Sequence, residues 1–182
     1  MVDLNASRSS RWLFRIARLR VTLGFVVAPV AFLLADPTYS SVVMGGLVSA
    51  CGEALRLWAA GHVRKSEEVT SSGPYRFTRH PLYLGSGILG VGFAIAAASL
   101  PVAVVVLGYL AVMLGVAITV EEAALRDKFG STYDGYASGT LEASSRPFSL
   151  EQAVRNGEHR ALLGFIASLG LLSLKVWFGS IV

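Results

Sequence analysis

The feature that most constrains the fold of this chain is a series of five long apolar segments that carry almost no charge. They cover residues 21–35, 41–62, 82–99, 102–120 and 161–182. Only 15% of the residues are charged, against roughly 25% in a typical soluble domain. A chain of 182 residues cannot bury so many uncharged runs in a soluble core, whereas about 20 apolar residues in a helix cross a ~30 Å hydrocarbon layer. The sequence therefore predicts an all-α integral membrane protein, with about five transmembrane helices in a single domain over residues 1–182.

The positions of the basic residues predict how these helices are oriented. Of the 16 Lys and Arg residues, 14 fall in segments 1–20, 63–81 and 121–160, and the loops at 36–40 and 99–101 contain none. Cytoplasmic loops are enriched in Lys and Arg, so this alternation places the amino terminus and the polar segments in the cytoplasm. We expect a multi-pass protein of a bacterial or archaeal inner membrane. Its first apolar segment lacks a clean cleavage site and is expected to be retained as a span.

The third and fourth apolar segments are separated only by Leu100-Pro101. This arrangement predicts a helical hairpin over residues 82–120, which returns the chain to the side from which it started. The polar segments 63–81 and 121–160 then lie on the same cytoplasmic face, where we expect a ligand pocket.

Two classes of function are disfavoured by the charge and the cysteine content. The net charge is +4, but the basic residues lie beside apolar spans rather than on a polar surface, so no nucleic-acid partner is expected. The single cysteine, Cys51, lies inside an apolar run. We therefore expect neither a disulfide nor a thiolate metal site, and no other metal site is predicted.

The first chemically informative segment is Gly73–Gly85, with the sequence GPYRFTRHPLYLG. Gly-Pro favours a turn, and Pro81 suits the first position of a helix. Arg79 and His80 therefore lie just before a helix amino terminus, where free backbone N–H groups and a basic side chain favour an anionic group.

The same segment carries two tyrosines, Tyr75 and Tyr83. Their rings could stack on an aromatic ligand or on an attached cation. They could equally belong to an interfacial belt, because Tyr, Arg and His often gather at bilayer boundaries. The residues alone favour neither interpretation.

Charged residues at the end of one span and inside another form the second set of candidates. Glu121 and Glu122 end an apolar span, and neighbouring helical positions point in different directions, so one of them is expected to face the protein interior. The alternative is a helix exit with solvated charges. Glu53 and Arg56 lie one turn apart inside another span. Intramembrane ions mark either a site or a paired bridge, and this spacing permits both.

Taken together, GPYRFTRHPLYLG and the later EEAALRDKFGSTYDGY resemble the isoprenylcysteine carboxyl methyltransferase family of membrane methyltransferases, which is similar to phospholipid methyltransferases. The resemblance covers about residues 50–137. It implies S-adenosyl-L-methionine as the methyl donor, bound on the cytoplasmic side. The acceptor implied is a membrane lipid or a lipidated small molecule, such as an isoprenylcysteine carboxylate. The cofactor contacts implied are Lys65, Glu68, Val69, Thr70, Tyr75, His80, Pro81, Leu82, Tyr83 and Glu121.

We expect Glu122 and Arg79 to orient or deprotonate the acceptor, which would enter sideways from the bilayer. One position departs from the family pattern, because Ala117 stands where an arginine is thought to contact the acceptor. Arg56 or Arg126 could replace it in binding the substrate. Two alternatives to the methyltransferase are a membrane reductase related to sterol reductases and a non-enzymatic lipid-binding membrane protein.

Overall fold

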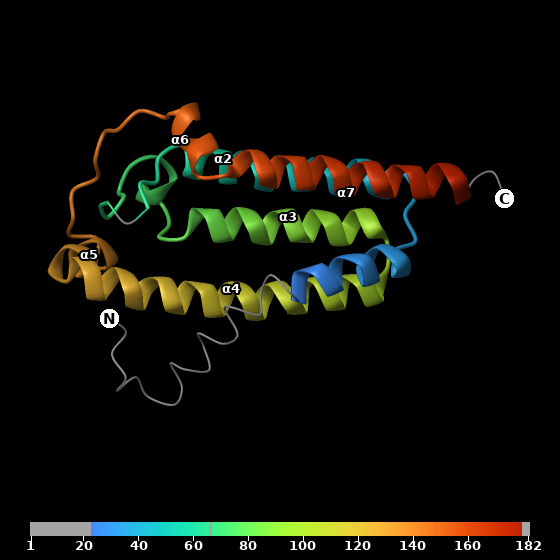
Figure 1. Cartoon of the computed structure of the whole chain (residues 1–182), viewed down its shortest axis with the longest axis horizontal. Helices are drawn as coiled ribbons and strands as arrows, with labels where there is room; N and C mark the ends of the chain where they lie inside the picture. The colour runs from blue at the N-terminus through green and yellow to red at the C-terminus, as the bar shows by residue number, and fades with distance from the viewer. Residues whose placement is uncertain (1–22, 66, 180–182) are drawn as a thin grey trace.

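All the regular structure that the computed structural model describes, over residues 23–65 and 67–179, is helical. Each of the five predicted apolar segments forms a helix, and three short helices lie between them (Figure 1). After a first helix at Leu23–Leu34, the elements are α2 (Tyr39–Ala60), η1 (Gly73–Arg76), α3 (Pro81–Ala97), α4 (Leu100–Phe129), α5 (Ser131–Ala137), α6 (Leu150–Arg155) and α7 (Glu158–Gly179).

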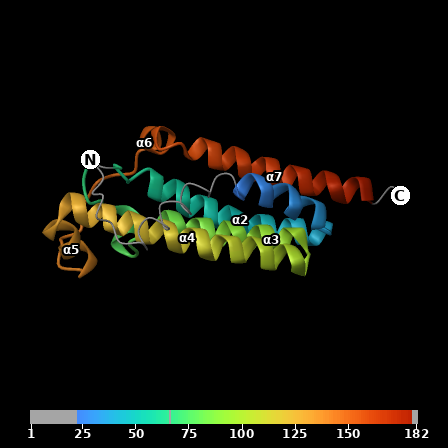
Figure 2. The same ribbon diagram turned by 60° about the horizontal axis from the view of Figure 1, so that its bottom comes forward.

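The long helices lie side by side in an elongated bundle. Helix α3 lies between α2 and α4, and α7 runs along α2 (Figures 1 and 2). The short helices η1, α5 and α6 gather at one end of this bundle, which we call the polar end. The predicted polar segments 63–81 and 121–160 therefore meet there, as the hairpin required.

Three helices are long and apolar enough to cross a membrane, namely α2, α4 and α7. Helix α3 has 17 residues, and at ~1.5 Å per residue it falls short of a ~30 Å core. The first helix is also a shorter apolar helix in its described part, and the predicted span 21–35 begins outside the described residues. The five-span topology and its orientation therefore stay predictions.

The hairpin turn and the end of α4 differ from the sequence prediction. The turn is made by Ala98 and Ser99, and Pro101 lies within the first turn of α4, where a missing N–H costs little. The predicted apolar span ends at 120, and helix α4 continues beyond it to Phe129. The added residues are mostly Glu, Ala, Leu, Arg and Lys, which favour helix, so the change from apolar to charged does not end it.

The overrun of α4 positions the second motif. At ~1.5 Å per residue, a helix of this length extends well beyond a ~30 Å hydrocarbon layer. Its last third carries Glu121 and Glu122 toward η1 rather than into a loop. Gly130, with φ +50°, then ends the helix and leads directly into α5.

Helices α2 and α3 approach each other closely along a row of small residues. A side chain at Gly52 would place its Cβ 2.6 Å from the carbonyl oxygen of Gly85, and one at Gly45 would collide with the backbone of Gly92. The hydroxyl of Ser49 donates to a backbone carbonyl of α3 over 3.1 Å. Small residues allow backbones to pack in this way inside a membrane, where apolar side chains alone give little preference for protein over lipid.

Candidate functional site

A cavity of about 290 Å³ opens at the polar end of the bundle. Its walls come from two parts of the chain, the segment 63–79 and the segment 121–136. Six of the predicted cofactor contacts line it, together with Arg79: Lys65, Glu68, Val69, Thr70, Tyr75 and Glu121.

The turn at Gly73 fixes how the first segment reaches the cavity. Gly73 has φ +58°, a conformation that favours glycine, and a Cβ there would collide with the ring of His62. Pro74 follows within η1 and is fully buried. The Gly-Pro pair therefore starts η1 as a tight, packed turn, which sends the ring of Tyr75 into the cavity.

Three tyrosines of the cavity stay protonated over the physiological pH range. Burial raises the pKa of Tyr75, and the nearby Glu121 carboxylate raises that pKa further. Burial also raises the pKa of Tyr133, and it raises that of Tyr136 to about 12. The Tyr136 hydroxyl donates to the Tyr75 backbone carbonyl over 2.8 Å, which attaches α5 to η1.

The hydroxyl of Tyr133 is buried and makes no hydrogen bond of normal geometry within the described residues, although the nearby Glu122 carboxylate contributes to its raised pKa. Tyr133 is 1% exposed, and the Arg126 guanidinium lies 5.5 Å from its ring centroid. A buried hydroxyl without a partner is costly. Because Tyr133 also lines the cavity, a ligand group there would supply the missing partner.

A cluster of three charged or polar side chains lies beside the cavity, and only Arg79 of the three lines it. His80 Nε2 lies 2.9 Å from Glu122 Oε1, and Arg79 approaches the same carboxylate oxygen within 3.3 Å. Glu122 is the inward-facing member of the acidic pair, with a side chain 19% exposed. Sequence reasoning expected one of the two carboxylates to turn inward, and the structure identifies which one.

An apolar groove of about 680 Å³ lies beyond this cluster, between α3 and α4. Its wall is mostly aliphatic, from residues such as Leu84, Val91 and Ile118. Two predicted cofactor contacts, His80 and Tyr83, lie in this groove and not in the cavity. Since His80 caps α3 and bonds to Glu122 on α4, its ring turns toward the α4 side.

The remaining predicted cofactor contacts, Pro81 and Leu82, line neither space. Pro81 occupies the first position of α3, as predicted, and is fully buried. The backbone carbonyl of Leu82 accepts a hydrogen bond from the Ser86 hydroxyl over 2.8 Å.

Both predicted substrate arginines form ion pairs with nearby carboxylates. Arg56 binds Glu158 of α7 through one guanidinium nitrogen, 2.6 and 2.8 Å from the two carboxylate oxygens. It also bonds to Ser86, and Glu53 lies 3.6 Å away. The structure therefore favours a bridge, whose main partner is Glu158 rather than Glu53.

Arg126 lies on the outer surface of α4, with a side chain 51% exposed. Its Nε donates to Asp134 over 3.3 Å, and its Nη1 lies 3.8 Å from Glu122 Oε2, at the edge of the Arg79–His80–Glu122 cluster. Neither Arg56 nor Arg126 lines the cavity or the groove. Ala117, at the position where the resemblance led us to expect an arginine, is buried within the bundle.

Several lining residues were not among the predicted contacts. They are Val63, Arg64, Ala124, Leu125, Lys128, Phe129, Tyr133 and Tyr136. Glu121, Leu125 and Phe129 are spaced four residues apart, which places them on one face of α4. A prediction that this helix continues beyond residue 120 would therefore have identified Leu125 and Phe129 as lining residues. Within the described parts of the chain, no group of three or more His, Cys, Asp or Glu side chains could hold a metal ion.

A known protein family matches the part of the chain that contains the first motif and most of the second. The family model described as phospholipid methyltransferase matches residues 40–132, from α2 through the start of α5. The cavity residues from Val63 to Glu121 lie inside this match.

Two curated bacterial proteins are similar to part of the chain. One is the cobalt-zinc-cadmium resistance protein CzcN of Cupriavidus metallidurans, 38% identical over 87 residues, which are 43% of this chain and 40% of that protein. The other is the nickel-cobalt-cadmium resistance protein NccN of Alcaligenes xylosoxydans xylosoxydans, 34% identical over 87 residues, which are 47% of this chain and 40% of that protein. The chain thus matches less than half the length of either relative. No solved structure matches it significantly.

Proposed function

Because this chain belongs to the phospholipid methyltransferase family, we propose that it transfers a methyl group from S-adenosyl-L-methionine to a lipophilic acceptor at one face of the membrane. One observation carries this proposal. Two segments that lie far apart in sequence, 63–79 and 121–136, line a single cavity at the polar end of a bundle of apolar helices.

The cavity fits the methyl donor in its chemistry. The donor carries a sulfonium, an ammonium, a carboxylate, ribose hydroxyls and an adenine ring. Glu68 and Glu121 would attract its cations, and Lys65 would bind its carboxylate. Tyr75 and Phe129 offer aromatic faces to the adenine or the sulfonium. When bound, the cofactor supplies an electrophilic methyl group.

Among the cavity residues, Tyr133 provides the sharpest test of whether the methyl donor binds there. It is buried, it keeps its proton, and it lines the cavity. A ligand carboxylate or hydroxyl beside it would accept its hydrogen bond and remove the cost of burying it unpaired.

The apolar groove would hold the acceptor. It runs along α3 from the His80–Glu122 pair toward Val91, which suits a hydrocarbon chain that enters from the bilayer. Since Arg79 contacts Glu122 and also lines the cavity, the same cluster borders both spaces. Glu122, which lies 2.9 Å from His80 Nε2, would orient the ring so that its other nitrogen could accept a proton from the acceptor. Arg79 would orient the Glu122 carboxylate.

Calorimetric titration of the purified protein with S-adenosyl-L-methionine tests the donor. We expect saturable binding, and we expect Tyr133→Phe to bind the donor several-fold more weakly, since one hydrogen bond contributes about 0.5–1.5 kcal/mol. Tyr39→Phe is the matched control, because Tyr39 is an exposed tyrosine at the opposite end of the bundle. No binding by the wild-type protein would contradict the proposal, and selective binding of NADPH would favour a reductase.

Methyl transfer from radiolabelled donor to a membrane lipid extract tests the acceptor. Prenylcysteine analogues, phosphatidylethanolamine and quinone-type lipids serve as separate substrates. We expect label in the lipid fraction with at least one of them, and a loss of labelling in His80→Ala and Glu122→Gln. Label that enters none of these fractions would contradict a lipophilic acceptor.

A further inference from the structure

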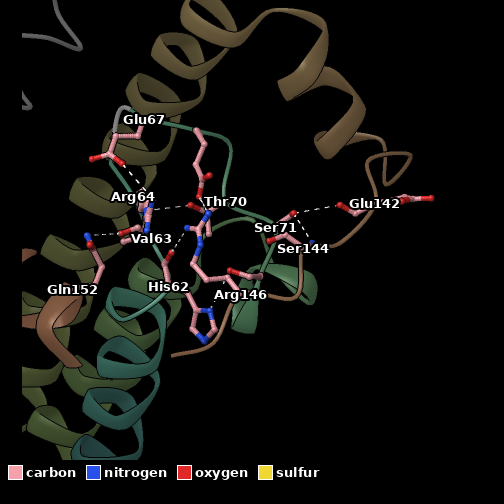
Figure 3. Close-up of polar contacts among 12 residues, drawn as sticks. His62, Val63, Arg64, Glu67, Thr70, Ser71, Glu142, Ser144, Arg146 and Gln152 are labelled. Carbon is pink, nitrogen blue, oxygen red and sulfur yellow. Dashed lines mark hydrogen bonds and ion pairs between the residues drawn. The ribbon is translucent and has the colours of Figure 1, made fainter. Parts of the chain in front are cut away.

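A strap of irregular chain, residues 142–149 between α5 and α6, crosses the segment that forms one wall of the cavity (Figure 3). The backbone N–H of Ser144 donates to the Ser71 hydroxyl over 3.0 Å, and that hydroxyl lies 3.3 Å from the carbonyl of Glu142. At the other end of the strap, the N–H of Ser149 donates to the carbonyl of Gly61 over 3.2 Å. The strap is therefore attached to both ends of the segment 61–72.

Arg146 is the charged residue at the centre of this attachment. Its guanidinium donates to the backbone carbonyl of His62 over 3.3 Å and forms an ion pair with Glu68 (Figure 3). The Arg146 side chain is 25% exposed, so this pair is partly shielded from water and from screening by salt. Glu68 lines the cavity, whereas Arg146 does not. Arg146 is therefore connected to the site through its ion pair with Glu68.

The wall has few other fixed contacts. Residues 63–65 and 67–72 contain no helix or strand. Their internal bonds are long, such as the 3.4 Å from the Arg64 N–H to the Thr70 hydroxyl. Gln152 and Asn156 donate to the carbonyl of Val63. The shape of this wall therefore depends on side chains that come after α5.

These side chains lie outside the part of the chain that matches the family, which ends at residue 132. The wall lies inside that part, whereas the strap and α6 do not. The part of the cavity wall inside the family match is thus supported by a segment that the match does not cover.

We propose that Arg146 is a positioning residue for the methyl donor, which acts through Glu68 and the carbonyl of His62 to hold the cavity wall in its binding shape. The inference rests on the proposed function of the cavity. When an irregular segment is already ordered before the ligand binds, the binding free energy is not reduced by the cost of ordering it. Preorganisation of the wall therefore raises the affinity for the ligand. Arg146 would therefore affect the binding of the donor more than the rate of the bound complex.

The test compares Arg146→Ala and Arg146→Lys with the wild type and with Arg155→Ala. Arg155 is a matched control, since it forms an exposed pair with Glu151 on α6 and does not line the cavity. Donor affinity is measured by calorimetry, and kcat is measured at saturating donor. Hydrogen exchange of the 62–70 backbone is measured without ligand.

We expect Arg146→Ala to bind the donor roughly tenfold more weakly, because hydrogen bonds to charged groups are lost. Exchange should quicken in residues 62–70 and stay unchanged in α2 and α3, while kcat should stay within about twofold. Arg146→Lys should recover part of the affinity, because a lysine can keep the ion pair but not both contacts. Arg155→Ala should behave as the wild type.

Wild-type affinity and wild-type exchange in Arg146→Ala would overturn the inference, as would faster exchange throughout the protein. If the wild-type protein binds no donor, the proposed function fails instead. In that case, unchanged hydrogen exchange of residues 62–70 in Arg146→Ala would still contradict the inference that the strap holds the cavity wall in place. Equal behaviour of Arg146→Ala and Arg155→Ala would also contradict it.

Discussion

Among single residues, His62 shows most clearly how the fold sets a protonation state. It is 4% exposed, its Nδ1 lies 3.1 Å from the Ser72 hydroxyl, and the ring of Phe148 packs beside it. Burial lowers the pKa of His62 from the usual 6.5, and the positive charges of Arg146 and Arg76 lower it further. The imidazole is therefore held neutral beneath the strap.

This arrangement predicts that the protein loses stability in mild acid. In the unfolded chain His62 takes up a proton near pH 6.5, whereas in the folded protein it does not until the pH is lower. The free energy of unfolding should fall as pH drops below this value, by at most about 1.4 kcal/mol per pH unit for one group. The loss should level off once the pH is below the folded-state pKa.

Thermal unfolding of detergent-solubilised protein between pH 7.5 and 5.5 measures this effect. His62→Gln cannot titrate there and should have a flatter profile than the wild type, whatever its stability at pH 7.5. Parallel profiles for the two proteins would show that His62 is not the group responsible.

At the scale of elements, the close contact between α2 and α3 gives the bundle its register. The glycines that meet there leave no room for a Cβ, and the backbone of one helix packs directly on the other. This pairing is the most extensive contact between two elements in the described structure. It holds η1 and the start of α3 against the end of α2.

We predict that Gly52→Val destabilises the protein by about 1–3 kcal/mol, because the added side chain forces α2 away from α3. Gly115→Ala is the control, since nothing lies within 4 Å of a Cβ at that position of α4. It should be neutral or slightly stabilising, because alanine favours helix over glycine. Unfolding in mixed micelles with increasing dodecyl sulfate measures both, and equal stability of the two variants would contradict the packing argument.

For the whole molecule, the hairpin and the bundle place the two motifs at one end and the loops without basic residues at the other. The loops 36–40 and 99–101 carry no Lys or Arg, and the backbone N–H of Asp36 donates to the carbonyl of Ala97 at that opposite end. The distribution of basic residues and the shape of the bundle therefore agree. Both place the two motifs at one end and the loops 36–40 and 99–101 at the other.

Cysteine labelling predicts the sidedness. With Cys51→Ser as background, Ser99→Cys should react with a membrane-impermeant maleimide in intact cells, and Ser138→Cys should react only after permeabilisation. Ser99 lies at the hairpin turn and Ser138 follows α5 at the polar end. Labelling of both sites from one side would contradict a bundle that crosses the membrane, whereas a reversed pattern would contradict only the orientation.

Several features of the fold followed from local sequence. The apolar runs become helices, Pro81 begins α3, and the Ser149 hydroxyl caps α6 by accepting from the N–H of Gln152. These outcomes depend on hydropathy and on residues within one turn of each other. The end of α4 was missed because a helix with favourable composition continues after its apolar residues stop.

What the sequence by itself determined is therefore the set of apolar helices, the hairpin, and the meeting of two polar motifs at one end. Only the tertiary structure decided which side chains share a space. It separated His80 from the cavity by pairing it with Glu122, engaged Arg56 with Glu158, 102 positions later, and laid Arg146 against Glu68. Such pairs depend on helix rotation and on the path of an irregular strap, which no periodicity in the chain encodes.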